Sequence, residues 1–237
     1  MANSKGRKFM IFGGWQKCTL IDFPGKIATI LFTQGCDFRC PYCHNRGLWP
    51  RKTESPVEWE TIFEFLKTRR GKLDGVVISG GEPTLHGDLP EVLAKIHELG
   101  FATKLDTNGH RPDVLEGLFK ANLFDFVAMD LKHLPAHYAE ACGTNVLIKN
   151  ILRSVELIKK SSIDHEFRTT VVPGLHRLED LPALAPIVQG ARRFTLQNFV
   201  PTHAADGTFR ARKPFARTEL EELRPIFTPI VEIFTIR

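Results

Sequence analysis

Short apolar runs alternate with longer stretches of helical periodicity along most of the chain. The apolar runs predict strands over 26–32, 75–79, 102–106, 124–130, 165–172 and 193–200. The periodic stretches predict helices over 55–69, 89–99, 150–160 and 181–188, with one more helix before residue 124. This alternation is typical of βα units around a parallel sheet. We count six such units, too few to close an eight-stranded barrel.

The first predicted helix begins with a capping signal. Ser55 is a suitable N-cap, Pro56 suits the first turn, and Glu58 completes a capping box. We therefore expect this helix to begin near Ser55.

Size and composition fit one sizeable globular domain: 237 residues, 43% hydrophobic and 25% charged. No apolar run approaches the roughly 20 residues that span a bilayer, and no signal peptide is evident. The formal charge is +5, but basic residues are scattered among acidic ones without a run of five. We expect a cytoplasmic protein that binds neither membrane nor nucleic acid. A basic face would also suit an acidic protein or an electron donor.

Three of the five cysteines, Cys36, Cys40 and Cys43, lie within eight residues, whereas Cys18 and Cys142 stand alone and are expected to be free thiols. A disulfide framework is not expected in a cytoplasmic chain. The C-x3-C-x2-C spacing predicts instead that the three thiolates bind a metal or a cluster.

A [4Fe–4S] cube normally takes four thiolates. Three cysteines leave one iron without a protein ligand, and an open position is typical of a reactive metal. An electron-transfer cluster would need a fourth cysteine, but Cys18 and Cys142 lie outside the motif. The alternative is a zinc site completed by His44. Because His44 directly follows Cys43, joint ligation by the two would be awkward.

Polar side chains gather where the predicted strands end. They are Cys36, Glu82, Asp106, Asn108, Asp130, Lys132 and Arg168. In parallel α/β folds the carboxyl ends of the strands form the active-site face. We therefore expect these side chains to surround one site.

The cysteine motif, with Tyr42 just before its third cysteine, resembles the signature of the radical S-adenosyl-L-methionine (SAM) superfamily. The string TQGCDFRCPYCHN is similar to the activating enzymes of glycyl radical enzymes. The longer string GGWQKCTLIDFPGKIATILFTQGC resembles the activating proteins of anaerobic ribonucleoside-triphosphate reductases. The likeness extends from about residue 12 to residue 201.

The resemblance implies an α/β fold, an incomplete (β/α)6 TIM-like barrel of the radical SAM type. It also implies one [4Fe–4S] cluster on Cys36, Cys40 and Cys43, with the amino and carboxylate groups of SAM on the open iron. Reductive cleavage of SAM would give methionine and a 5′-deoxyadenosyl radical, so that the cofactor performs the difficult step.

The resemblance also assigns a SAM pocket. Gly80, Gly81 and Glu82 match the GGE motif, which contacts the amino group of SAM, and Tyr42 belongs to the same pocket. Glycines after a strand let backbone groups approach a ligand closely. The alternative is a simple Gly-Gly turn before a helix.

Two further strand-end motifs match 106–109 and 129–132. In the family, such positions hold a monovalent cation beside the SAM carboxylate, and oxygen donors suit a hard cation. The resemblance places Asp106, Asn108 and Asp130 in the pocket. Lys132 would pair with the carboxylate, and Arg168 would contact SAM through its guanidinium.

The alternatives for these residues are structural. Asp106 and Asp130 could cap the helices that follow them, and Arg168 could pair with Glu166 at the surface. The sequence also departs from some relatives: Gln197 stands where they place a histidine, which leaves the adenine contacts open. No cysteine lies between Cys43 and Glu82, so we expect one cluster only.

The expected organisation is an N-terminal extension over 1–25, a radical SAM core over 26–201 and a C-terminal closing segment over 202–237, with a helix and a terminal strand. The expected activity is hydrogen abstraction from a glycine of anaerobic ribonucleoside-triphosphate reductase, with a flavodoxin-like reductant. The alternatives are another glycyl radical enzyme or a small molecule, as in deazapurine synthases, and a non-catalytic electron-transfer or zinc module.

Overall fold

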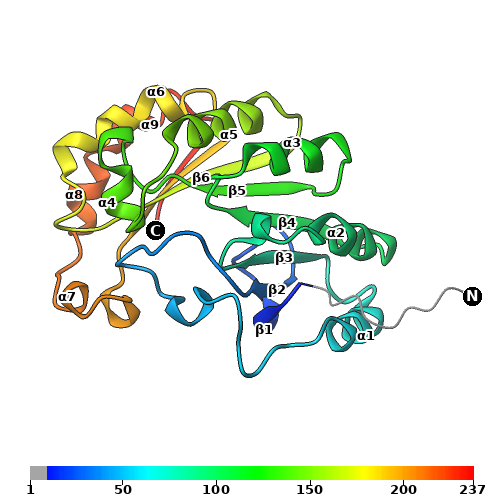
Figure 1. Cartoon of the computed structure of the whole chain (residues 1–237). Coiled ribbons are helices and arrows are strands. Elements are labelled where there is room, and N and C mark those ends of the chain that lie inside the picture. Colours follow the sequence, from blue (N-terminus) through cyan, green and yellow to red (C-terminus); the bar gives the residue numbers. More distant parts are fainter. Residues whose placement is uncertain (1–9) are drawn as a thin grey trace, which may run out of the picture.

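The computed structural model describes residues 10–237. Residues 1–9, the start of the expected N-terminal extension and the segment considered as a signal peptide, lie outside the described residues. Eight strands form one sheet in the order β1 to β8 (Figure 1). The strands are β1 (Phe12–Thr19), β2 (Ala28–Thr33), β3 (Gly75–Gly80), β4 (Ala102–Thr107), β5 (Phe126–Asp130), β6 (Asp164–Val171), β7 (Arg193–Asn198) and β8 (Ile233–Ile236).

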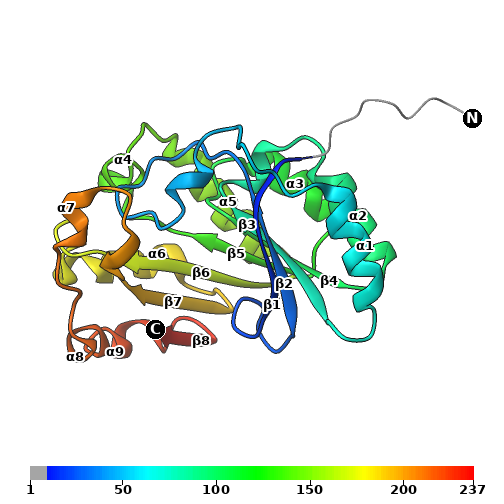
Figure 2. The same ribbon diagram turned by 90° about the horizontal axis from the view of Figure 1, so that it is seen from below.

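Most helices lie along the outer face of the curved sheet, whereas α7 lies near the loop that follows β2 (Figures 1 and 2). The α-helices are α1 (Trp59–Arg69), α2 (Leu89–Glu98), α3 (Pro112–Lys120), α4 (Tyr138–Cys142), α5 (Ile148–Lys160), α6 (Ala185–Val188), α7 (Gly207–Arg210), α8 (Arg217–Glu221) and α9 (Arg224–Phe227). Short 3-10 helices are η1 (Arg46–Leu48), η2 (Pro83–Leu85), η3 (Pro135–His137), η4 (Leu178–Leu184) and η5 (Pro201–His203).

The predicted α/β fold, an incomplete barrel, is confirmed. Strands β2 to β8 are parallel neighbours, and each connection between them carries at least one helix. The terminal strand expected after residue 202 is β8. The sequence did not predict β1, which pairs antiparallel with β2. Its residues alternate poorly between apolar and polar, so the strand signal was weak.

The predicted start of the first helix is wrong. Helix α1 begins at Trp59, its N-cap is Glu58, and no side chain caps it. The reason is tertiary: Val57 forms an antiparallel bridge with Phe12, and its N–H donates to the Phe12 carbonyl at 2.8 Å. The chain is therefore extended where the capping box was expected.

Side chains alternate between the two faces of the sheet, as they must in strands. Outward residues such as Val76, Leu105 and Phe167 join the large core under the helices. Inward residues form a small apolar floor, which consists of Phe23, Ala28, Ile30, Val77, Phe126 and Ala128. Nearer the carboxyl ends the inward positions become polar, and this change places a site inside the sheet.

The sheet does not close on itself. In the described sheet β1 and β8 are the two edge strands, and each pairs with one neighbour only. Figure 2 shows the β1–β2 hairpin and the β7–β8 edge on the side that the helices leave free. Among residues 10–237, no helix is long and apolar enough to cross a membrane.

Candidate active site

The segment 34–45 after β2, here called the cysteine loop, holds the three cysteines. Figure 1 shows it crossing the carboxyl ends of the strands toward α4. The N–H of Phe38 donates to Cys36 Sγ at 3.4 Å, and the N–H of Asn45 donates to Cys43 Sγ at 3.3 Å. Such N–H···S contacts stabilise negative charge on sulfur and are among the factors that set the potential of iron–sulfur clusters.

Burial determines the ionisation of the free thiols. It raises the pKa of Cys36 to about 12 and also raises the pKa of Cys43. Both thiols therefore keep their protons at neutral pH until a positive metal centre binds them. A coordinating metal deprotonates a thiol outright.

Cys142 lies against the cysteine loop, although the sequence placed it far outside the motif. It is fully buried in α4 and lies beside Cys40. Its carbonyl accepts the N–H of Arg39 at 2.7 Å. The neighbouring Cys142 is the main cause that lowers the pKa of Cys40.

The glycines at the end of β3 pack on the end of β2 and the start of the cysteine loop. The N–H of Gly81 donates to the Thr33 carbonyl at 2.9 Å, and the N–H of Glu82 donates to the Gly35 carbonyl at 2.8 Å. A Cβ on Gly81 would collide with the Gly35 carbonyl, and Gly80 has a φ of 111°. The glycines therefore allow the end of β3 to approach the backbone of residues 33–35 closely. This packing role goes beyond that of a simple Gly-Gly turn.

Glu82 is almost fully buried, at 1% exposure. Its Oε1 accepts from the N–H and the hydroxyl of Thr84 at 3.1 and 2.5 Å and from the hydroxyl of Thr107 at 2.8 Å. Its Oε2 accepts the N–H of Asn108 at 2.7 Å. Burial raises the pKa of Glu82 to about 7 despite these donors. A cation beside the carboxylate would lower its pKa again.

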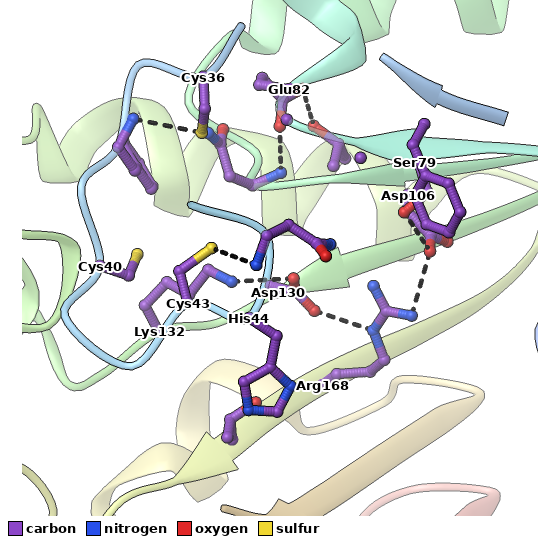
Figure 3. A pocket seen from close by; sticks show the side chains of 18 of the residues that line it. Cys36, Cys40, Cys43, His44, Ser79, Glu82, Asp106, Asp130, Lys132 and Arg168 are labelled. Atoms are coloured by element: carbon purple, nitrogen blue, oxygen red, sulfur yellow. Dashed lines mark hydrogen bonds and ion pairs between the residues drawn. The ribbon is translucent and has the colours of Figure 1, made fainter. Parts of the chain in front are cut away.

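A chain of charged side chains crosses the inside of the sheet (Figure 3). Arg168 Nε donates to Asp130 at 2.8 Å, and its Nη1 donates to Asp106 at 3.4 Å. Lys132 donates to Asp130 at 2.9 Å, and Lys104 donates to Asp106 at 2.5 Å. Lys104, Asp106, Asp130 and Arg168 lie in β4, β5 and β6, where period-two alternation turns them inward, and Lys132 follows β5 directly.

These pairs hold the two carboxylates ionised. Burial alone would raise the pKa of Asp106 and of Asp130, but neighbouring cations outweigh it, and both pKa values are lowered. For Asp106 the cations are Arg168 and Lys104, and for Asp130 they are Arg168 and Lys132. Burial lowers the pKa of Lys104 itself.

The same geometry contradicts the structural alternatives for these residues. The helices after β4 and β5 begin beyond Arg111 and His137, so neither carboxylate is an N-cap. Arg168 lies inside the sheet and not in a surface pair with Glu166, which instead accepts the hydroxyl of Thr195 at 2.6 Å.

Asn108 links the strand β4 to the cysteine loop. Its side-chain amide donates to Asp37 Oδ1 at 2.8 Å, and its own carbonyl oxygen accepts the N–H of His110 at 2.9 Å. His110 Nδ1 lies 3.2 Å from Asp37 Oδ2. Both polar ends of the Asn108 side chain thus have protein partners, and the residue fixes the loop that carries Cys36.

All the predicted site residues line one pocket of about 520 Å³. They are Cys36, Cys40, Tyr42, Cys43, Gly80, Gly81, Glu82, Asp106, Asn108, Asp130, Lys132 and Arg168. His44 and Gln197 also line it, and His44 Nε2 lies 2.7 Å from the Val200 carbonyl. The pocket extends to the hairpin between β1 and β2, where Ile21 and Asp22 border it.

A single-metal site does not fit the pocket. Within the described range 10–237, no three side chains of His, Cys, Asp or Glu lie close enough to share one ion. Zinc needs its ligands around one centre. A cube of four irons takes its thiolates on different irons, so cysteines that share a wall without converging suit a cluster.

Comparison with known proteins agrees with the cysteine motif. Residues 30–184 match the family model described as Radical SAM superfamily. A protein named as a glycyl-radical enzyme activating enzyme, from Methanocaldococcus jannaschii, is 38% identical over 92% of this chain and 91% of its own length. The pyruvate formate-lyase-activating enzyme of Streptococcus mutans is 31% identical over 86% of this chain and 81% of its own. The chain belongs to the glycyl-radical enzyme activating family of radical SAM enzymes.

The cofactors of a radical SAM enzyme are a [4Fe–4S] cluster and SAM, and the pocket has donors for both. Among solved structures, Streptococcus suis SuiB bound to its precursor peptide SuiA matches with a TM-score of 0.69 at 18% identity. The match covers 88% of this chain and 48% of that longer one. At this identity it supports the fold alone, and that fold is the partial barrel described above.

Sequence reasoning missed several residues of the site. Lys104 and Ser79 both contact Asp106, and Ser79 Oγ donates to it at 3.1 Å. Lys104 was detectable, since it stands two positions before Asp106 in one strand and must share its face. Asp37 and Asp22 carried no such signal, because their contacts depend on how distant loops meet.

Proposed function

We propose that this radical SAM enzyme abstracts a hydrogen atom from a glycine of anaerobic ribonucleoside-triphosphate reductase and so generates a glycyl radical. The similarity of residues 13–36 to the activators of such reductases supports the choice of substrate. The observation that carries the proposal is the open side of the sheet, where the pocket reaches the hairpin residues Ile21 and Asp22. A chain segment of another protein can enter there, whereas a closed barrel would exclude it.

In this proposal Cys36, Cys40 and Cys43 hold the cluster and leave one iron to the amino and carboxylate groups of SAM. The cluster supplies the electron that cleaves SAM to methionine and the hydrogen-abstracting deoxyadenosyl group. Glu82 accepts the SAM ammonium, which stabilises the ionised form of its carboxyl group.

The proposed partners of the SAM carboxylate are Lys132 and Arg168. Asp130 bonds both cations, at 2.9 and 2.8 Å, and thereby fixes them before the ligand arrives. Such preorganisation reduces the ordering that binding requires. Tyr42, Gly80, Gly81, Asp106 and Asn108 complete the proposed SAM pocket.

A monovalent cation beside Asp106 and Asp130 is the further cofactor that the resemblance implies. The two carboxylates offer the oxygen donors that a hard cation prefers. Both already pair with protein cations, namely Lys104, Lys132 and Arg168. The deciding measurement is SAM affinity in sodium or potassium salts against a bulky organic cation. Equal affinity in all three would remove the cation from the proposal.

We further propose a cytoplasmic location and one flavodoxin-like reductant. All five cysteines are free thiols in the structure, and reduced thiols persist where glutathione and thioredoxin keep the compartment reducing.

The test is electron paramagnetic resonance on anaerobically reconstituted protein with dithionite, SAM and the anaerobic reductase of the same organism. A glycyl radical doublet is expected, and Cys36→Ala, Cys40→Ala or Cys43→Ala should each abolish it. The control substitution is Cys18→Ala, because Cys18 is exposed and does not line the pocket. Pyruvate formate-lyase serves as the competing protein substrate.

The outcome separates the alternatives. A doublet on pyruvate formate-lyase and none on the reductase would keep the activating chemistry and replace the substrate. Production of 5′-deoxyadenosine without any protein radical would instead favour a small-molecule substrate, as in deazapurine synthases.

A further inference from the structure

Basic side chains are concentrated in the cysteine loop, in the residues that follow it and in a second segment that packs against it. Residues 36–52 and 201–213 together carry seven basic residues against two acidic ones, Asp37 and Asp206. Their formal charge of +5 equals that of the whole chain, so the rest of the molecule is balanced. The basic residues, here called the basic rim, are Arg39, Arg46, Arg51, Lys52, Arg210, Arg212 and Lys213.

The fold brings the two segments of the rim together. The N–H of Asp206 donates to the Pro41 carbonyl at 2.9 Å, and Arg46 Nη1 donates to the Ala205 carbonyl at 3.5 Å. In Figure 1 the loop after β2 runs toward α7, which contains Arg210. The sequence showed basic residues scattered among acidic ones, and only the tertiary structure gathers them.

The positive charge of the rim is open to solvent. Every member except Arg212 is exposed. Of the two acidic residues, Asp37 is half-buried and faces Arg111 at 3.8 Å, which offsets its charge. An approaching protein would therefore meet a field dominated by the rim.

The rim lies where an electron must enter. The cysteine loop carries Arg39 and is followed directly by Arg46, and its three cysteines line the pocket. Arg39 is held in place: its Nη1 donates to the carbonyls of Cys36 and Phe38 at 2.6 and 2.7 Å, and its guanidinium stacks over Trp49 at 5.6 Å. The loop is thus the wall between solvent and the proposed cluster.

We infer that the basic rim is the docking surface for an acidic one-electron carrier protein. Charge complementarity suits the small, polar and short-lived interfaces of electron-transfer complexes. The inference rests on one part of the proposed function, namely that the protein holds a cluster which an external electron donor reduces. It does not depend on which protein substrate is activated.

The test compares two triple charge reversals of equal size. The rim variant carries Arg46→Glu, Lys52→Glu and Lys213→Glu. The matched control carries Lys72→Glu, Lys149→Glu and Lys160→Glu, three exposed positions before β3 and on α5. Iron content and circular dichroism verify loading and folding. If the triple rim variant does not take up the cluster, the single variant Lys213→Glu replaces it in the test. Lys213 lies far from the cysteine loop in sequence, so its substitution is not expected to disturb cluster binding.

The measurement is the second-order rate at which an acidic flavodoxin hydroquinone reduces the cluster, followed by stopped-flow absorbance at low and high salt. We expect the rim variant to be at least about tenfold slower than wild type at low salt, and the control within about twofold. The difference should vanish near 0.5 M salt, roughly where screening removes steering. Binding of oxidised flavodoxin, measured by fluorescence anisotropy, should weaken in parallel, and reduction by dithionite should stay nearly unchanged.

The inference would be overturned if both variants slowed cluster reduction equally, or if the reduction rate did not depend on salt concentration. So would normal reduction by flavodoxin together with a lost glycyl radical yield under dithionite, since the rim would then bind the protein substrate. Neither SAM nor a glycyl radical enzyme enters the reduction assay. A wrong protein substrate in the proposed function would therefore leave its result unchanged.

Discussion

Gly80 and Gly81 belong to the proposed SAM pocket, and they also pack against the start of the cysteine loop. The same two residues therefore serve ligand binding and the packing of the β3 end on that loop. Cys142 has a similar double position, because it packs α4 on the loop and contacts Cys40. At the residue scale, the proposed cofactor site depends on these backbone and sulfur contacts as much as on its charged side chains.

Gly81→Ala should destabilise the protein and impair cluster loading, because the added Cβ collides with the Gly35 carbonyl. A loss of about 3 kcal/mol is expected from overpacking of a rigid backbone contact. Urea unfolding and iron content after reconstitution measure the two effects. Gly87→Ala is the control, since a Cβ there meets nothing within 4 Å. Equal stability of the two variants would contradict the prediction.

Cys142→Ala should lower the reduction potential of the cluster. Cys142 lies beside Cys40, and we expect its thiol to donate to this ligand once the cluster is bound. Loss of a hydrogen bond to a cluster ligand disfavours the more negative reduced state. A weak bond of under 1 kcal/mol corresponds to a shift on the order of 20–40 mV for one electron. A redox titration followed by paramagnetic resonance tests this, with the exposed Cys18→Ala as control. An unchanged potential would refute the expected bond.

At the element scale, the loops after β5 and β6 are joined by two buried histidines. The rings of His133 and His176 stack at 4.3 Å with an angle of 10°. His176 Nδ1 accepts the N–H of Val172 at 3.0 Å, and its Nε2 donates to the Lys132 carbonyl at 3.0 Å. His133 accepts from Leu134 and donates to Leu175 in the same way. Each ring is thus held as the neutral tautomer.

The stability of the protein should fall below pH 6.5. Burial, with a contribution from His133, lowers the pKa of His176 to about 4 from its ordinary value of 6.5. The stabilisation is therefore present above pH 6.5 and lost as the pH falls toward 4, by at most about 3 kcal/mol. Urea unfolding between pH 7.5 and 4.5 measures it. His176→Gln should flatten the pH dependence, whereas the exposed His203→Gln should leave it unchanged.

For the whole molecule, the decisive property is that the sheet is open between β1 and β8. The β1–β2 hairpin borders this side, and its turn exposes Leu20 at 70% and Ile21 at 81%. Ile21 also lines the pocket. Large apolar side chains exposed at a pocket edge are candidates for contact with a macromolecular substrate.

The double substitution Leu20→Ser and Ile21→Ser should raise KM for the glycyl radical enzyme about tenfold, which corresponds to roughly 1.4 kcal/mol of lost contact. Cleavage of SAM without protein substrate should not change. Leu147→Ser with Leu152→Ser is the control, since these leucines are exposed at α5, away from the pocket. A rise in KM for both pairs would mean that the hairpin has no special role.

The fold class, the cysteine motif and the strand-end residues of the pocket could all be predicted from the sequence. These depend on local rules: period-two and helical patterns, and the carboxyl ends of parallel strands meeting at one face. A resemblance to a known family supplied the cofactors and the proposed roles. The same alternation rule also places Lys104 on the face of β4 that carries Asp106, although this residue was not among the predicted site residues.

The three-dimensional fold alone established the contacts between segments far apart in the chain. It paired Phe12 with Val57, which delayed the first helix, and it placed Cys142 against Cys40. It also gathered the basic rim from two segments about 150 residues apart. Local propensity cannot determine such contacts, because they join residues that are distant in the sequence. Their stabilising free energy is gained only after the loops have packed and the sheet has formed.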